Sequence, residues 1–129
     1  MQAEKILQKK IHREIGSRLD VRAFINDVGG GYHGTPVNRS GETFLRNPKP
    51  FRYGLQKGVS DILGYQHIII TPDMVGREIA VFLAIEVKNP DGGKPSPEQI
   101  NFIRTVERFG GISGFARSVE EAVKIIEGR

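Results

Sequence analysis

The chain contains no cysteine, so disulfides, a thiolate nucleophile and cysteine-ligated zinc are all excluded. This absence fits a reducing compartment. Histidine is also scarce, and the three histidines, His12, His33 and His67, form no metal-ligand spacing with one another. A histidine-based metal site and an HNH-type nuclease are therefore disfavoured. The serines lack the histidine and aspartate context of a nucleophilic triad.

Long apolar runs are missing as well. No segment approaches the roughly 20 apolar residues that a membrane span requires, and Met1–Lys5 begins an amphipathic helix instead of a signal-peptide apolar region. We expect no membrane partner and a cytoplasmic location in a bacterial or phage-infected cell, or a nuclear location in a eukaryote. A length of 129 residues suits a single domain, residues 1–129, because two halves would each bury too little apolar surface.

Acidic residues are rare in one long segment. The net charge of the chain is +4, and between Gly29 and Gly58 the only acid is Glu42, among five basic and four aromatic residues. The triple glycine 29–31 indicates a turn, and residues 32–57 predict a long loop with room for a short strand over 42–45. Such a loop suits phosphate contacts and base stacking, and a solvated surface loop explains it equally well. The candidate nucleic-acid contacts are Arg39, Arg46, Lys49, Arg52, Lys57 and Ser60.

The remaining periodicity predicts helices and strands in mixed order. In chain order we expect a helix over residues 2–19, strands over 21–28, 61–63, 66–71 and 77–88, a helix over 97–109, a strand over 112–117 and a last helix after Ser118. The strands over 61–63 and 66–71 are one continuous strand or two. The fold class is therefore α/β (α+β), with a mixed central sheet flanked by helices.

Three charged residues, Asp61, Glu86 and Lys88, flank the two β-branched apolar runs that we expect at the buried centre of the sheet, His67–Thr71 and Ile79–Leu83. Charged groups are rarely buried unless they are paired or bind a metal. Residues i and i+2 of a strand share a face, so Glu86 and Lys88 project together. We expect Ile85 and Val87 to pack on the other side.

Two carboxylates on neighbouring strands predict a site for a hard divalent cation such as Mg²⁺, which prefers oxygen ligands. The predicted metal ligands are Asp61, Glu86 and the backbone carbonyl of Val87. Lys88 would hold the attacking water or contact the phosphate. A salt bridge from Lys88 to Glu86 or Asp61 at the edge of the sheet is the structural alternative.

Two helices each place a polar residue toward the sheet. In the first helix Glu4 is centred on the apolar stripe of Leu7, Ile11, Ile15 and Leu19. A charge at a fraying helix start explains Glu4 equally well, and Glu14 is a second candidate carboxylate. Gln99 faces the sheet from the second helix, and it also completes a capping box with Ser96.

Together these segments resemble a known family. The helix with Glu4, Gly58–Asp61, Ile85–Lys88 and Ser96–Gln99 look like the virus-type replication-repair nuclease (VRR-NUC) domain, a branch of the PD-(D/E)xK nuclease superfamily. The resemblance covers nearly the whole chain. It implies a restriction-endonuclease-like core of order αβββαβ, followed here by one more helix. It also implies metal binding by Asp61 and Glu86, assistance of the water by Lys88, and completion of the site by Glu4 and Gln99.

We therefore expect a DNA endonuclease that depends on Mg²⁺ or Mn²⁺. Small stand-alone members of the family resemble Holliday-junction resolvases, which implies a homodimer acting on branched DNA in replication, repair or recombination, with a helicase as a conceivable partner. The alternatives are a restriction-type enzyme or exonuclease of the same superfamily, or a non-catalytic nucleic-acid-binding module. The presence of both carboxylates together with Lys88 favours the enzyme, because a binding module has no need for carboxylates facing phosphates.

Overall fold

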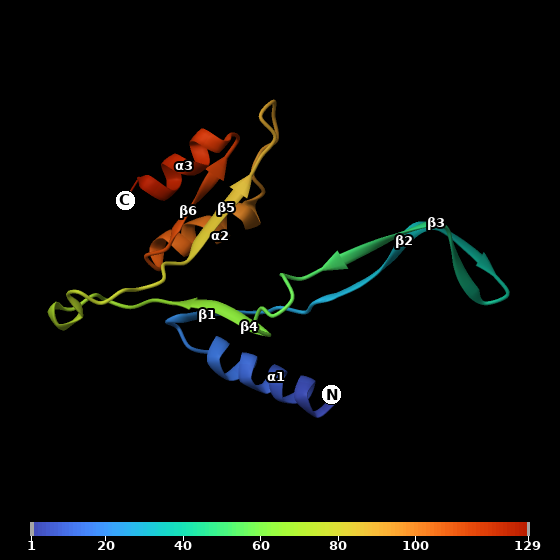
Figure 1. Ribbon diagram of the computed structural model, residues 1–129, viewed down its shortest axis with the longest axis horizontal. Helices are drawn as coiled ribbons and strands as arrows, with labels where there is room; N and C mark the ends of the chain where they lie inside the picture. Colours follow the sequence, from blue (N-terminus) through green and yellow to red (C-terminus); the bar gives the residue numbers. More distant parts are fainter. Residues whose placement is uncertain (1, 129) are drawn as a thin grey trace. The chain divides into compact units, whose positions relative to one another are not determined.

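The computed structural model describes residues 2–128 (Figure 1). Along the chain its elements are α1 (Gln2–Gly16), β1 (Val21–Ile25), β2 (Gly29–Arg39), β3 (Glu42–Tyr53), β4 (Ile62–Gln66), the 3₁₀ turn η1 (Pro72–Met74), β5 (Leu83–Val87), α2 (Pro97–Arg108), β6 (Ile112–Ala116) and α3 (Val119–Glu127). The chain divides into two compact units between Gly64 and Tyr65. The single domain over residues 1–129 stays a prediction.

In the first unit α1 packs against β1, and β1 pairs with β4. The less exposed side chains of α1 are Gln8, His12 and Ile15, and the Nε2 atom of His12 lies 2.9 Å from the carbonyl oxygen of Ala23 in β1. The predicted helix was too long, because α1 ends at Gly16 and Leu19 is exposed beyond it. Leu19 therefore does not belong to the helical stripe.

Residues 29–53 form a long antiparallel β-hairpin, β2 with β3, so the prediction of a loop was wrong (Figure 1). The two turn residues, Ser40 and Gly41, have positive φ angles of 50° and 77°, which two-residue hairpin turns favour. The triple glycine lies within β2 and is not a turn. Glycine and proline are depleted in strands, so their abundance here hid the hairpin from inference based on composition.

The second unit contains a parallel ladder of β5 and β6 joined by α2. The hydroxyl of Ser113 in β6 donates to the Ile103 carbonyl of α2 over 2.8 Å. The next residue, Gly114, faces α3, because a Cβ atom there would lie 2.8 Å from Cδ1 of Ile125. Successive strand residues point to opposite faces, so α2 and α3 cover opposite faces of this ladder. The buried apolar side chains of the described chain are all in this unit: Ile103, Val106 and Ala116.

The segment between β4 and β5 departs from the sequence-based expectation. Residues 67–71 and 77–82 are not assigned to strands, and η1 lies between them. Ile69 is 77% exposed, so the β-branched run is not the buried centre of a sheet. A short apolar run shows that a strand is compatible with the sequence, but a strand forms only where a partner offers hydrogen bonds. Val87 was also predicted to pack, but it is the last residue of β5 and is 75% exposed.

The fold is a mixture of helices and strands, as the sequence predicts. Within residues 2–128 the strands pair as three two-stranded ladders, β1 with β4, β2 with β3 and β5 with β6. One mixed central sheet does not form among these residues, because the two segments that would widen the ladders carry no strand. None of the described helices combines the length and the apolar character that crossing a membrane demands.

The contact of β4 with β1 gives a first prediction. A Cβ atom at Gly64 would lie 2.1 Å from the carbonyl oxygen of Arg22, whereas one at Gly16 would meet nothing within 4 Å. We expect Gly64→Ala to lower the free energy of unfolding by about 1–3 kcal/mol, because backbone must shift. The control Gly16→Ala, at the end of α1, should be neutral or slightly stabilising. Urea unfolding followed by circular dichroism measures both, and equal stabilities of the two variants would contradict the close approach.

Candidate functional site: two carboxylate-bearing clusters

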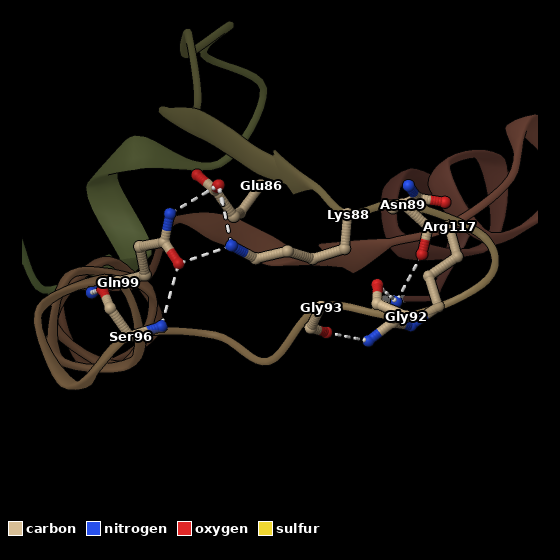
Figure 2. Close-up of polar contacts among 8 residues, drawn as sticks. All are labelled: Glu86, Lys88, Asn89, Gly92, Gly93, Ser96, Gln99 and Arg117. Atoms are coloured by element: carbon tan, nitrogen blue, oxygen red, sulfur yellow. Dashed lines mark hydrogen bonds and ion pairs between the residues drawn. The ribbon is translucent and has the colours of Figure 1, made fainter.

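Three predicted site residues meet in the second unit (Figure 2). The Nζ atom of Lys88 donates to Oε1 of Gln99 over 2.6 Å, and Nε2 of Gln99 donates to Oε1 of Glu86 over 2.7 Å. Lys88 and Glu86 also form an ion pair of 3.4 Å. The salt-bridge alternative for Lys88 is thus present, with Gln99 connecting both of its members.

Helix α2 fixes the side chain of Gln99. The backbone N–H of Ser96 donates to Oε1 of Gln99 over 3.0 Å, and the backbone N–H of Gln99 donates to Oγ of Ser96 over 3.1 Å, which completes the predicted capping box. Oε1 therefore accepts from both Ser96 and Lys88, while Nε2 donates to Glu86. This pattern settles the orientation of the amide, since its two ends meet groups of opposite character. Gln99 therefore completes the capping box and also contacts Glu86 and Lys88.

The ammonium of Lys88 is held in a confined place, while Glu86 stays accessible. The side chain of Lys88 is 14% exposed, and that of Glu86 is 35% exposed. The contacts of Glu86 with Gln99 and Lys88 both use Oε1, and among residues 2–128 no partner is found for Oε2. Glu86 and Gln99 also line a hollow of about 480 Å³ together with Glu98 and Phe102. One carboxylate oxygen of Glu86 is thus open to a further ligand.

Arg117, which the sequence reasoning missed, holds the loop between β5 and α2. Its guanidinium donates to the carbonyl oxygens of Asn89, Gly92 and Gly93 over 2.5, 2.6 and 2.7 Å (Figure 2). This loop runs from Lys88, which directly follows β5, to the helix that carries Gln99. Arg117 is therefore a positioning residue. The sequence offers little signal for it, because backbone carbonyls of a glycine-rich turn have no sequence signature.

The other predicted carboxylates lie in the first unit, around a second hollow. Glu4 and Asp61 both line this space of about 300 Å³, and a third carboxylate, Asp27, lines it too. Lys5 and Lys57 contribute positive charge at the same place, and Lys5 pairs with Asp27 at 3.3 Å. Glu14, the competing carboxylate of α1, is absent from the lining. Within this unit the structure brings Glu4 and Asp61 to the same hollow.

Asn26 anchors the segment that carries Asp61. Its backbone N–H donates to the Asp61 carbonyl over 2.8 Å, and its Nδ2 donates to the Ser60 carbonyl over 3.1 Å. Its Oδ1 accepts from the N–H of Leu55 over 3.0 Å. Asn26 directly follows β1, so it ties the strand end to the residues just before β4. An asparagine after a strand normally indicates a turn, so its function as an anchor was not foreseen.

The predicted metal ligands thus divide between two places. Asp61 and Glu4 belong to the first unit, and Glu86 and the backbone of Val87 belong to the second. Among residues 2–128 no group of three or more histidine, cysteine, aspartate or glutamate side chains is arranged to hold a metal ion. The donor chemistry of Asp61 and Glu86 suits Mg²⁺ or Mn²⁺, because both offer carboxylate oxygens.

The predicted nucleic-acid contacts fall on the hairpin and just beyond it. Arg39 ends β2, and Arg46, Lys49 and Arg52 lie on β3, where every residue is exposed. Lys57 lines the hollow of Glu4 and Asp61, and the carbonyl of Ser60 is held by Asn26. Comparison with protein-family models, with curated proteins and with solved structures finds no match for this chain. The site must therefore be interpreted from its own chemistry.

The arginine that holds the β5–α2 loop gives the second prediction. We expect Arg117→Met to lower the free energy of unfolding by about 1–3 kcal/mol, because three carbonyl acceptors lose a charged donor. Arg117→Lys should recover part of the loss, since one ammonium cannot reproduce the planar fork. The matched control is Arg104→Met on the exposed side of α2, with a change below about 0.5 kcal/mol. Urea unfolding tests all three variants. An unchanged free energy of unfolding in Arg117→Met would show that the loop needs no anchor.

Proposed function

We propose that this protein is a divalent-metal-dependent DNA endonuclease with a VRR-NUC-like core of the PD-(D/E)xK type. The observation that supports this most is the contact of Glu86, Gln99 and Lys88. A glutamate of β5, the lysine that directly follows β5 and a glutamine of α2 meet through side-chain hydrogen bonds of 2.6 and 2.7 Å. This arrangement places an open carboxylate oxygen beside a nearly enclosed ammonium, which suits hydrolysis of a phosphodiester.

The donor set fits a hard cation. In the second unit Glu86 and the backbone carbonyl of Val87 would hold Mg²⁺ or Mn²⁺, and in the first unit Asp61 and Glu4 are the carboxylates proposed as ligands. The bound ion would supply charge neutralisation at the scissile phosphate and a more acidic water. Glu86 supports this role, because its Oε2 keeps room for a ligand while Gln99 and Lys88 hold Oε1.

Lys88 and Gln99 have separate tasks in the proposal. Lys88 orients the attacking water, or contacts a phosphate oxygen as negative charge builds up in the transition state. The water oxygen forms a bond to phosphorus and the bond to the leaving sugar oxygen breaks. The proton of the attacking water passes to solvent, and the leaving sugar oxygen takes up a proton from solvent. Gln99 sets the direction of the Lys88 ammonium, because its Oε1 accepts from Nζ while the capping box fixes the amide.

The partner we propose is DNA, in particular branched DNA, bound by a homodimer. The basic hairpin supplies the charge for phosphate contacts, and a two-fold assembly suits cutting of two strands. Action beside a helicase and a cytoplasmic or nuclear location belong to this proposal. A restriction-type enzyme or an exonuclease of the same superfamily is the alternative among enzymes. Among the described residues no feature by itself indicates recognition of a DNA branch point.

A non-catalytic nucleic-acid-binding module is the rival. The ion pair of Lys88 with Glu86 supports it, because a strand-edge salt bridge needs no catalytic purpose. The small fraction of Lys88 that is exposed argues against it. An enclosed ammonium pays a desolvation cost, and an exposed surface bridge contributes little stability. A purely structural ion pair would not require that Oε2 of Glu86 stay accessible.

Cleavage assays give the third prediction. We expect the purified protein to cut branched DNA only when Mg²⁺ or Mn²⁺ is added, and EDTA to stop it. Asp61→Asn, Glu86→Gln and Lys88→Met should each lower the cleavage rate by roughly 10²–10⁴-fold, because each removes a group used in the transition state. DNA binding in EDTA should persist.

Matched controls use residues of the same type outside both clusters. Asp91→Asn, Glu107→Gln and Lys124→Met make the same chemical changes at exposed positions, and their rates should equal that of the wild type. Metal-independent binding without cutting of duplex, flap or four-way substrates would assign the chain to the binding-module class.

The hairpin gives the fourth prediction, which concerns salt. Each phosphate contact by Arg46, Lys49 or Arg52 releases condensed counterions, so each replacement by Ala should reduce the slope of log affinity against log salt by about 0.9 on duplex DNA. Fluorescence anisotropy over a salt series measures the slope. Arg104→Ala on α2 is the control. Slopes equal to that of the wild type for all three hairpin variants would remove this hairpin from the DNA interface.

A further inference from the structure

One face of the β2–β3 hairpin carries a row of three aromatic rings. Directly paired residues share a face, and the pairs Gly29 with Tyr53, Gly31 with Phe51, and His33 with Lys49 alternate along the hairpin. The ring centroids of His33 and Phe51 are 6.0 Å apart, and those of Phe51 and Tyr53 are 6.3 Å apart. We call these three rings, His33, Phe51 and Tyr53, the aromatic row.

The rings of Tyr53 and Phe51 pack against the glycines that face them on β2. A Cβ atom at Gly29 would lie 2.4 Å from the hydroxyl oxygen of Tyr53, and one at Gly31 would lie 3.1 Å from the Phe51 ring. Both rings therefore lie directly against the backbone of β2, in the space that a side chain at Gly29 or Gly31 would occupy. Neither glycine has a positive φ angle, so ring packing, and not backbone conformation, accounts for the absence of a side chain at both positions.

The outer faces of these rings remain in solvent. Phe51 is 43% exposed and Tyr53 is 51% exposed, and every residue of β3 is exposed. Burial within the unit therefore does not explain the row. Lys49 lies on the same face as His33. Arg52 pairs with Gly30 and therefore belongs to the opposite face, and Arg46 lies beyond the irregular pairing between His33 and Thr35. Glu42, at the hairpin tip, is the only acid between Gly29 and Tyr53.

We infer that the aromatic row binds the unpaired bases of single-stranded DNA by stacking. Exposed aromatic faces beside the cation Lys49, on a hairpin that is rich in basic residues, match bases joined by phosphates, whereas a protein or membrane partner would not require rings and positive charge together. The spacing of about 6 Å between rings exceeds the rise of about 3.4 Å between stacked bases. Neighbouring bases can meet separate rings only if the strand is unstacked, so duplex DNA cannot use the row. The inference shares the DNA partner of the proposed function and deepens it toward substrates with single-stranded segments.

A purely structural role for the row makes a different prediction. Rings lying over glycines stabilise a strand, and an isolated two-stranded hairpin is marginal in water. If the rings serve only this purpose, any large apolar side chain at position 51 that preserves the fold preserves DNA binding. If they stack on bases, a flat ring is needed, and Phe51→Leu fails where Phe51→Trp succeeds.

The first test measures affinity for a thymidine oligomer in EDTA, where cleavage is absent. We expect Phe51→Leu to weaken binding by about 5- to 150-fold, the loss of one stacked base, with the slope against log salt unchanged. Phe51→Trp should restore affinity. The control Tyr32→Leu removes a ring from the opposite face, where Tyr32 pairs with Pro50, and should change affinity less than 2-fold. Equal affinity of Phe51→Leu and wild type, or an equal loss with Tyr32→Leu, would overturn the inference.

The second test uses the fluorescence of the protein itself. The chain has no tryptophan and three tyrosines, so its emission comes from tyrosine. Stacking on thymine should quench Tyr53, and Tyr53→Phe should therefore bind the oligomer with little quenching, whereas Tyr32→Phe keeps it. Unchanged quenching in Tyr53→Phe contradicts stacking at this ring. Sedimentation of the free protein checks the rival occupant, because a shift in self-association by Phe51→Leu would assign the row to contact with a second copy.

The nuclease proposal and this inference fail in different ways. Lys88→Met should bind and quench normally without cutting, which supports the row independently of catalysis. If the oligomer quenches the tyrosine emission of the wild-type protein but the protein never cuts DNA, the stacking inference stands and the nuclease proposal fails. If the wild-type protein cuts branched DNA but Phe51→Leu binds the oligomer as tightly as the wild type, the nuclease proposal stands and the stacking inference fails.

Discussion

The side chain of Gln99 is the point on which the second unit depends. Its amide closes the N-terminus of α2 through Ser96, and the same amide joins Glu86 to Lys88. One side chain therefore both caps the start of α2 and aligns Glu86 of β5 with Lys88, which directly follows β5. This coupling has a physical advantage, because an amide that is already fixed loses no further rotamer entropy when it contacts the lysine.

The two carboxylate clusters are supported in different ways. Around Glu86 the support comes from side chains, with Gln99 on one side and the Arg117-held loop beneath the lysine. Around Asp61 it comes from backbone groups, because Asn26 holds the carbonyls of Ser60 and Asp61. Both arrangements leave carboxylate oxygens accessible while fixing the chain behind them, which is what a site for a hydrated cation needs.

The hairpin is stabilised differently from the rest of the chain. Its strands bury almost nothing, so its shape depends on backbone pairing, a two-residue turn with positive φ angles and rings lying over glycines. The hairpin keeps apolar rings and cations in solvent. The proposed nucleic-acid partner would contact both.

Local patterns in the sequence determined much of this protein. The capping box at Ser96, the start of α3 at Ser118, the pairing of Glu86 with Lys88 on one strand face and the mixed content of helices and strands all follow from near neighbours in the chain. Only tertiary structure decided the rest. Whether residues 67–71 became a strand depended on a distant partner, and the carbonyls that Arg117 binds have no sequence signature. The glycine-rich segment became a hairpin because cross-strand rings could occupy the space that its missing side chains left, and no local propensity contains that information.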